Sequence, residues 1–217
     1  MMGFRALAVL GAGTALLVLA TVASAAVILG TPGDDVLRGT QGADEIRAFA
    51  GNDQVYGRAG ADLIRAGVGD DLVRGGDGDD LVYTGHGNDT LHGGNGSDRL
   101  YGGSDNDSLY GGNGSDWAAG NRGDDVVFGG NGNDTLYGGW GADRLYGGNG
   151  NDVLHALAPD GQPDLLACGS GNDTAYVLRS ERPTTTLRGC ERVFVEISPP
   201  PDQSAAENAD ADAEADG

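Results

Sequence analysis

Aspartate recurring at a fixed interval is the feature of this sequence most able to do chemistry. From Gly30 to His155 the chain divides into fourteen nine-residue units, and each unit carries Asp at its sixth position. The fourth position is Gly except at Asp105, and the eighth is Val, Leu or Ile except at Ala118. Carboxylate oxygens are the ligands that hard divalent cations prefer. The pattern therefore predicts a row of cation sites.

The full repeat extends this pattern to most positions of the unit. Examples are GGNGSDRLY at 93–101 and GGNGNDTLY at 129–137. They resemble the RTX (repeats-in-toxin) family of haemolysin-type calcium-binding repeats, GGxGxDxUx. The resemblance covers Gly30 to His155 and implies a parallel β-roll with two units per coil and calcium in its turns. Fourteen units would form seven coils, about 34 Å long at ~4.8 Å per coil.

Short strands and tight turns are the elements that must position the aspartates. The glycines suit turns because glycine adopts positive φ without strain. The aliphatic residue at the eighth position lies between two others, which suits a three-residue strand with one inward side chain. So short a strand cannot bury a core alone. We therefore expect an all-β fold, a parallel β-solenoid in which each coil stacks on the next.

Calcium fits the expected spacing of the aspartates. Turns on one side of the roll come from units eighteen residues apart, so their carboxylates should stack. Two carboxylates ~5 Å apart repel by roughly 3 kcal/mol at an effective dielectric of 20. Ca²⁺ bonds oxygen at about 2.3–2.6 Å and could bridge two layers, whereas Mg²⁺ spans too little. We predict several Ca²⁺ ions, and a roll that is disfavoured without them.

The units from Asp71 onward are the most regular, and we predict the ligands there. The aspartates are Asp71, Asp80, Asp89, Asp98, Asp107, Asp116, Asp125, Asp134, Asp143 and Asp152. The turn glycines are Gly76, Gly78, Gly94, Gly96, Gly112, Gly114, Gly130, Gly132, Gly148 and Gly150. The earlier units depart further from the repeat, so we expect weak or missing sites among them.

Composition excludes several classes of function. The chain has 33 acidic and 13 basic residues, all of the latter Arg, for a formal charge of −20. Such a surface repels nucleic acid and anionic lipid and attracts cations. The sequence shows no Ser-His-Asp order, no acid/base pair of Glu and no nucleotide-binding loop, so we predict no enzymatic activity. We expect His86, His92 and His155 to be solvated rather than catalytic.

Four segments are expected along the chain. Residues 1–25 are apolar, end in small residues, and are typical of a secretory signal; a retained membrane anchor is the alternative. Cleavage would leave a secreted, extracellular chain with no membrane segment. Residues 26–155 are the roll, 156–197 a C-terminal β cap with a closing strand at Val193, Val195 and Ile197, and 198–217 a disordered acidic tail.

The remaining features leave alternatives open. Cys168 and Cys190 predict a disulfide that pins the cap, with two free buried thiols as the alternative. Ninth-position rings, such as Tyr83 and Tyr110, predict outward aromatic ladders. These ladders stabilise strands or serve as a stacking platform for sugars, which would make the protein an adhesion or polysaccharide-binding module. An ice-binding surface or a secreted hydrolase is less supported, since no Thr ladder or catalytic segment is present.

Overall fold

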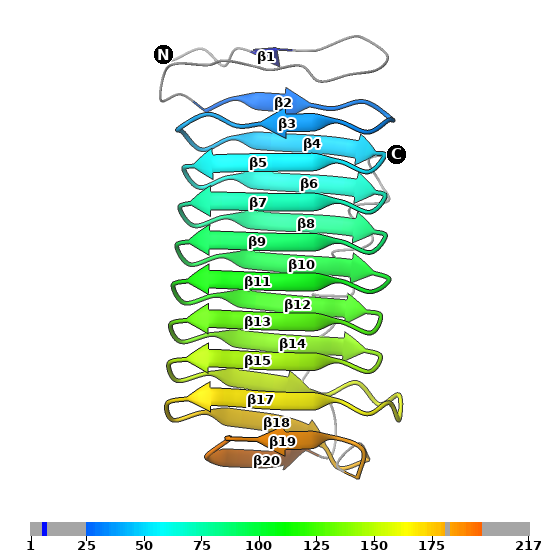
Figure 1. Ribbon diagram of the computed structural model, residues 1–217, viewed down its shortest axis with the longest axis vertical. Helices are drawn as coiled ribbons and strands as arrows, with labels where there is room; N and C mark the ends of the chain where they lie inside the picture. The colour runs from blue at the N-terminus through cyan, green and yellow to red at the C-terminus, as the bar shows by residue number, and fades with distance from the viewer. Residues whose placement is uncertain (1–5, 8–24, 181–182, 197–217) are drawn as a thin grey trace.

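The described residues form a parallel β-solenoid of about nine turns (Figure 1). The computed structural model describes residues 6–7, 25–180 and 183–196, and none of these is in a helix. The even-numbered strands and β1 form one sheet in the order β1-β2-β4-β6-β8-β10-β12-β14-β16-β18-β20. The other sheet has the order β19-β17-β15-β13-β11-β9-β7-β5-β3. We call these the even sheet and the odd sheet.

The strand bounds follow the repeat closely. The strands are β1 (Ala6–Leu7), β2 (Val27–Leu29), β3 (Val36–Arg38), β4 (Glu45–Ala50), β5 (Gln54–Ala59), β6 (Leu63–Val68), β7 (Leu72–Asp77), β8 (Leu81–His86), β9 (Thr90–Asn95), β10 (Arg99–Ser104), β11 (Ser108–Asn113), β12 (Trp117–Arg122), β13 (Val126–Asn131), β14 (Thr135–Trp140), β15 (Arg144–Asn149), β16 (Val153–Ala156), β17 (Leu165–Ser170), β18 (Thr174–Leu178), β19 (Thr186–Arg188) and β20 (Arg192–Glu196). Most of the predicted signal segment, the acidic tail and Ile197 lie outside the described residues. No helix in the described part of the chain is able to span a membrane.

Most strands are six residues long, twice the predicted length. Three residues at the end of one unit continue without a break into the first three of the next. In β10, for example, Gly103 pairs with Gly85 of β8 one coil earlier. Gly103 has a φ of 115° and so allows the strand to bend towards the turn. The glycine doublet therefore belongs to the strand end, and the turn itself is shorter than the sequence indicated.

The core is a double row of aliphatic side chains from the eighth position of each unit. Leu100 and Leu109, from opposite sheets, are each fully buried, as are their equivalents along the roll. Burial of each such side chain contributes roughly 1.5–3 kcal/mol. Each coil supplies only two of them, so no coil has enough apolar surface to fold alone and stability comes from stacking.

The predicted C-terminal cap continues the roll, which is why there are about nine turns and not seven. Strands β16 to β20 extend both sheets in the same parallel register. Three extra residues in the loop before β17 shift the pairing interval, so Arg144 of β15 pairs with Leu165. The predicted Cys168–Cys190 disulfide is present, with a Cα–Cα distance of 5.1 Å, and ties β17 to the segment before β20.

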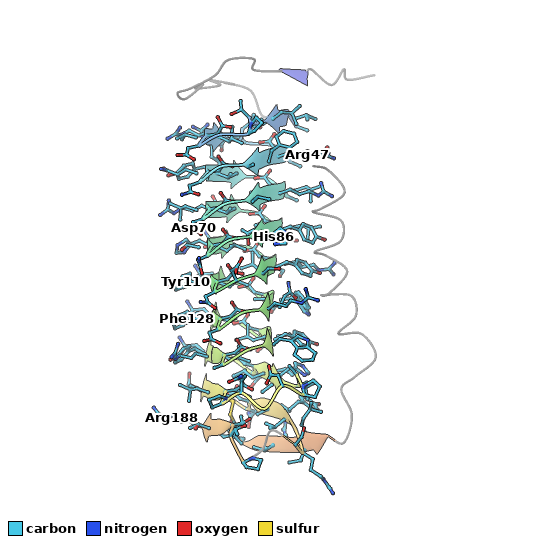
Figure 2. The ribbon with its side chains drawn as sticks, turned by 90° about the vertical axis from the view of Figure 1, so that its right-hand side faces the viewer. Arg47, Asp70, His86, Tyr110, Phe128 and Arg188 are labelled. Carbon is cyan, nitrogen blue, oxygen red and sulfur yellow. A yellow bond between two sulfur atoms is a disulfide. The ribbon has the colours of Figure 1, made fainter. Side chains whose placement is uncertain are left out.

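Stacked rings cover the outer faces of both sheets. In the even sheet the ladder runs Tyr83, Tyr101, Trp117, Tyr137, His155, Tyr176 and Phe194, with centroid distances of 4.2–5.2 Å. Trp117 fills the gap that the sequence left at Ala119. In the odd sheet His92, Tyr110, Phe128 and Tyr146 stack in the same way, and Figure 2 labels two of them. His155 lies between two rings and His92 stacks on Tyr110 alone, so both are half-buried and not solvated as predicted.

Candidate metal centre

Each aspartate of the repeat lies directly before a strand and points into the turn. Asp98, before β10, is only 1% exposed. Its Oδ1 accepts a hydrogen bond of 2.9 Å from the N–H of Asp80, one coil earlier, and its own N–H donates to Asp116 Oδ1 at 2.9 Å. The predicted stacking of aspartates eighteen residues apart is thus present, and the backbone of one coil is linked to the carboxylate of the next.

The same bond repeats along two ladders, one on each side of the roll. The first joins Ala26, Asp44, Asp62, Asp80, Asp98, Asp116, Asp134, Asp152, Asp173 and Glu191. The second joins Asp35, Asp53, Asp71, Asp89, Asp107, Asp125, Asp143 and Asp164. All ten predicted aspartates belong to one ladder or the other. The carboxylates are therefore held by the fold before any ion is considered.

The second oxygen of these carboxylates is buried and has no hydrogen-bond partner. This holds for Oδ2 of Asp53, Asp62, Asp71, Asp80, Asp89, Asp98, Asp107, Asp116, Asp125, Asp134, Asp152 and Asp173. A buried carboxylate oxygen with no partner is costly, by at least about 1–3 kcal/mol. A row of them is unusual in a folded protein and indicates a missing positive charge.

Beside several of the unpartnered oxygens the coils pack so closely that only glycine fits at the first position of the unit. At Gly93, the first residue of its unit, a Cβ would overlap Asp98 Oδ2 and lie 2.7 Å from the carbonyl oxygen of Gly111 in the next coil. Gly57, Gly75, Gly111 and Gly129 on this side show the same crowding, with the carbonyl oxygen at 2.6–2.8 Å. A carboxylate oxygen and a backbone carbonyl therefore come close together in these layers. This all-oxygen set suits a hard cation such as Ca²⁺.

Burial is the main reason why the carboxylates need a positive charge. It raises the pKa of Asp98 and of Asp125 to about 7, from an ordinary value of 3.8, and that of Asp107 to about 9. The N–H bond from the preceding coil lowers each pKa in part, and neighbouring carboxylates add to the rise. From the sequence we expected mutual repulsion of the carboxylates to be the main cause of the instability of the calcium-free roll. In the structure that repulsion is secondary to the loss of solvation.

Of the predicted turn glycines, those at the second position, such as Gly94, lie at strand ends, and those at the fourth, such as Gly96, lie in the turn. All ten have φ between 108° and 139°, a region that favours glycine. A side chain at either position would overlap the coil before it, because a Cβ on Gly94 would meet the Gly76 carbonyl oxygen and one on Gly96 that of Gly78. Their role as carbonyl ligands stays a prediction.

Several members of the ladders escaped the sequence prediction. First-position glycines such as Gly93 were omitted, although the glycine doublet marks them. Asp53 and Asp62 were expected to be weak, yet each has the same buried, unpartnered oxygen as the later aspartates. Asp164 lies after a three-residue insertion that breaks the period, but Asp followed by two Leu could have revealed it.

Side chains alone cannot chelate an ion in the part of the chain that the structure describes. No group of three or more His, Cys, Asp or Glu side chains is close enough there to hold a metal. Any bound ion must then take some of its ligands from backbone carbonyls. Zinc is a poor fit, because it prefers His and Cys, while His92 and His155 lie in ring stacks and the cysteines are bridged.

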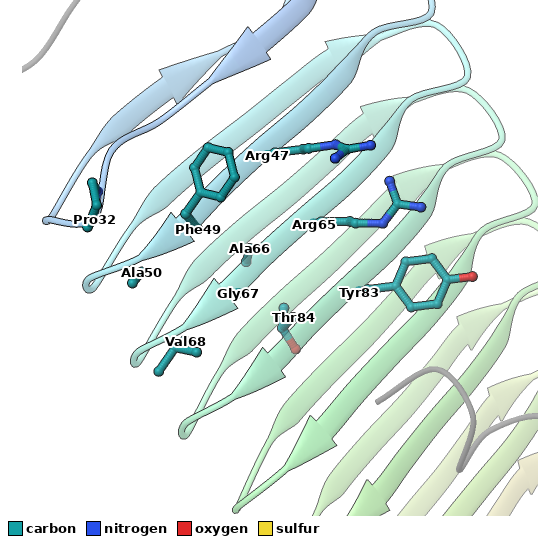
Figure 3. Close-up of a pocket in the computed structure, with 10 residues that line it drawn as sticks. All are labelled: Pro32, Arg47, Phe49, Ala50, Arg65, Ala66, Gly67, Val68, Tyr83 and Thr84. Carbon is teal, nitrogen blue, oxygen red and sulfur yellow. The ribbon is translucent and has the colours of Figure 1, made fainter. Parts of the chain in front are cut away.

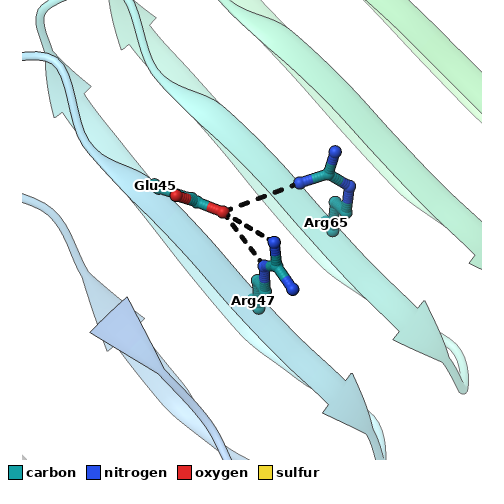
Figure 4. Close-up of polar contacts among 3 residues, drawn as sticks. All are labelled: Glu45, Arg47 and Arg65. Carbon is teal, nitrogen blue, oxygen red and sulfur yellow. Dashed lines mark hydrogen bonds and ion pairs between the residues drawn. The ribbon is translucent and has the colours of Figure 1, made fainter. Parts of the chain in front are cut away.

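One apolar pocket lies away from the aspartates, on the outer face of the even sheet (Figure 3). Its volume is about 320 Å³, and Phe49 and Val68 form part of its wall. The guanidinium groups of Arg47 and Arg65 pair with Glu45, at 2.9 Å and 3.9 Å (Figure 4). Both guanidinium groups line the pocket and Arg65 Nη1 is buried without a hydrogen bond, but most of the wall is apolar.

The fold and the site together define a metal-binding β-roll built from nonapeptides. The family model of the RTX calcium-binding nonapeptide repeat matches residues 29–64, 56–91, 83–118, 92–127 and 119–154, more than half of the chain. The chain therefore belongs to the RTX calcium-binding repeat family, and it is a calcium-binding β-roll protein. No curated protein sequence matches it significantly.

Proposed function

We propose that this is a secreted, non-catalytic protein whose aspartate and glycine turns bind several Ca²⁺ ions and which folds on export. The observation that carries the proposal is the row of buried Oδ2 atoms without a partner. Near several of them a backbone carbonyl of the next coil lies beside the same first-position glycine, as the Gly111 carbonyl lies beside Gly93 and Asp98 Oδ2. A divalent cation at these positions would replace the solvation that the carboxylates lose on folding.

Different residues of the chain have different roles in holding the ions. The ladder of N–H bonds fixes Oδ1, which leaves Oδ2 without a partner, as in Asp98, where it lies close to Gly93. Glycines at the second and fourth positions let successive coils approach without side chains between them. Calcium would supply the charge that this arrangement lacks.

Folding on export follows from the cost of the calcium-free roll. The formal charge is −20, and the buried aspartates disfavour the folded state while they are ionised. Calcium is scarce in the cytoplasm and reaches millimolar concentrations outside the cell, where sites with Kd of about 10⁻⁴–10⁻³ M fill. Binding free energy then becomes folding free energy. The predicted signal segment supports secretion.

The aromatic ladders do not favour the adhesion or polysaccharide-binding alternative. Most neighbouring rings are nearly parallel, for example Tyr110 and Phe128 at an interplanar angle of 4°. Each inner ring therefore has its faces covered by its neighbours and presents its edge to solvent. Stacking on a sugar needs a free face. Polysaccharide binding stays a prediction that a glycan array in calcium would test.

A calcium titration of the chain from residue 26 onward tests the proposed function. We expect the β signal in far-UV circular dichroism to rise with Ca²⁺ and not with equal Mg²⁺. Isothermal calorimetry should show several ions per chain, and EGTA should reverse both effects. Full β structure in excess EGTA would overturn the proposal, as would an unfolded chain at saturating CaCl₂.

A further inference from the structure

The even sheet ends in an open apolar edge at β20 (Figure 1). Among the described residues β20 pairs only with β18, so no described strand covers its outer edge. Val193, Phe194 and Val195 are 38%, 48% and 36% exposed. Val193 and Val195 lie in register with the core residues Ala175 and Val177, so they are core side chains without a coil above them.

An edge of this kind favours pairing with another strand. An exposed, apolar edge strand is a template for pairing with another chain, and proteins usually protect it with charge, proline or a covering element. Three consecutive residues at the centre of β20 are apolar, and charge appears only at its ends, Arg192 and Glu196. At the other end of the roll β1 pairs with β2 and Ile28 is buried, but β1 lies in the predicted signal segment, so its removal would expose that edge as well.

We propose that β20 pairs antiparallel with β20 of a second copy of this chain, so that two rolls join end to end. The sequence RVFVE is complementary to itself in this arrangement. With Phe194 opposite Phe194 of the copy, each Val193 is opposite a Val195 and each Arg192 is opposite a Glu196. Apolar and opposite-charge cross-strand pairs both stabilise a sheet. A two-fold axis closes the contact, so it gives a dimer and not a filament.

The last coil itself does not oppose the approach of two copies. Residues 174–200 contain four Arg and three Glu and no Asp, a formal charge of +1, whereas the six acidic residues further along, at 202–216, lie outside the described residues. The rest of the molecule would repel a second copy. The edge is also fixed in position, because the Cys168–Cys190 disulfide ties the last coil to the one before.

The ring ladder supports the same pairing. Phe194 is the last ring of the even sheet and stacks on Tyr176 at 5.2 Å. Its other face has no ring neighbour among the described residues. In the antiparallel pair, Phe194 of the copy would take the next place in the ladder, at about the same interstrand spacing.

Charge reversal at the ends of β20 tests the proposal. The chain from residue 26 is measured in calcium by light scattering coupled to size exclusion and by sedimentation. We expect a dimer for the unaltered chain. Arg192→Glu and Glu196→Arg each place like charges opposite one another twice, and each should weaken the dimer at least about tenfold.

Restoring the opposite charges shows whether a single variant loses the dimer because the strands no longer pair or because the chain misfolds. The double variant R192E/E196R, or an equimolar mixture of the two single variants, restores opposite charges across the interface and should recover the dimer. Calcium-induced circular dichroism confirms that each variant folds. A monomer at all concentrations, larger assemblies, or a dimer unaffected by single reversals would overturn the inference. The proposed dimer and the proposed calcium sites are tested separately, because a folded monomer would refute the dimer and leave calcium binding intact.

Discussion

Replacing Asp125 by Asn should shift the calcium-free and calcium-loaded states in opposite directions. Asp125 is fully buried, its Oδ1 accepts from Asp107 N–H at 2.7 Å, and its Oδ2 has no partner. Burial raises its pKa from 3.8 to about 7. Three pKa units correspond to about 4 kcal/mol of destabilisation when the group is ionised. Screening near the turn reduces this to roughly 2–4 kcal/mol.

Asn keeps the Oδ1 acceptor and the shape of the side chain but removes the charge. The calcium-free roll should therefore gain roughly 2–4 kcal/mol at pH 8. Calcium binding should weaken, because an amide N–H₂ replaces the Oδ2 ligand. The first effect is measured as a higher pH midpoint for loss of β structure in EDTA. The second is a higher half-saturating Ca²⁺ concentration, with fewer ions per chain by calorimetry.

Asp124→Asn is the matched control. It makes the same charge change at the adjacent, exposed residue, and its Oδ1 can still accept from Ala142 N–H. We expect little change in either state. If Asp125→Asn destabilised both states, or left the calcium titration unchanged, a structural role would explain the carboxylate and the ligand assignment would be wrong.

Three further changes test other parts of the structure. The raised pKa values mean that the calcium-free roll binds protons more tightly than the unfolded chain. Its stability is therefore greatest below about pH 4 and is lost as pH rises through about 7. Circular dichroism in EDTA should show β structure appearing as the pH falls from 8 to 5, and β structure that instead increased with rising pH would contradict this. Arg58→Gly should stabilise the calcium-loaded roll by about 1 kcal/mol in urea unfolding, because Arg58 is exposed with φ 86°, while Arg58→Ala should not. Reduction of Cys168–Cys190, which closes a loop of 22 residues, should cost about 3 kcal/mol in the same assay, and an unchanged midpoint would show that the bridge is dispensable.

The repeat determines most of the fold, and therefore the fold could be predicted well. The phase of Asp and aliphatic residues defined two strands per coil, the stacking of turns and the inward row of Leu and Val. Local irregularities were harder to predict. Trp117 fills the place in the ring ladder that Ala119 left, because a long side chain at a neighbouring outward position can reach it.

The site was predicted in its residues but not in its energetics. Sequence spacing identified Asp98 and its equivalents, yet it could not show that the N–H of Asp80 already satisfies one oxygen of Asp98. That bond divides each carboxylate into a structural oxygen and one left for an ion. Nor could spacing show the burial that raises the pKa values, since burial depends on how closely the coils stack.

The ladders of N–H bonds also have a direction. Each sixth-position aspartate of a ladder, such as Asp80 or Asp98, donates its backbone hydrogen to the coil that follows it in the chain. When the chain emerges amino end first, the aspartate N–H of the newest coil on each side therefore has no acceptor until the next coil forms. On one side the open donor is Asp173 N–H, and Glu191 closes it at 2.8 Å from within the segment that the disulfide secures. The Glu191 carboxylate thus takes the place of the next ladder aspartate in the last described coil.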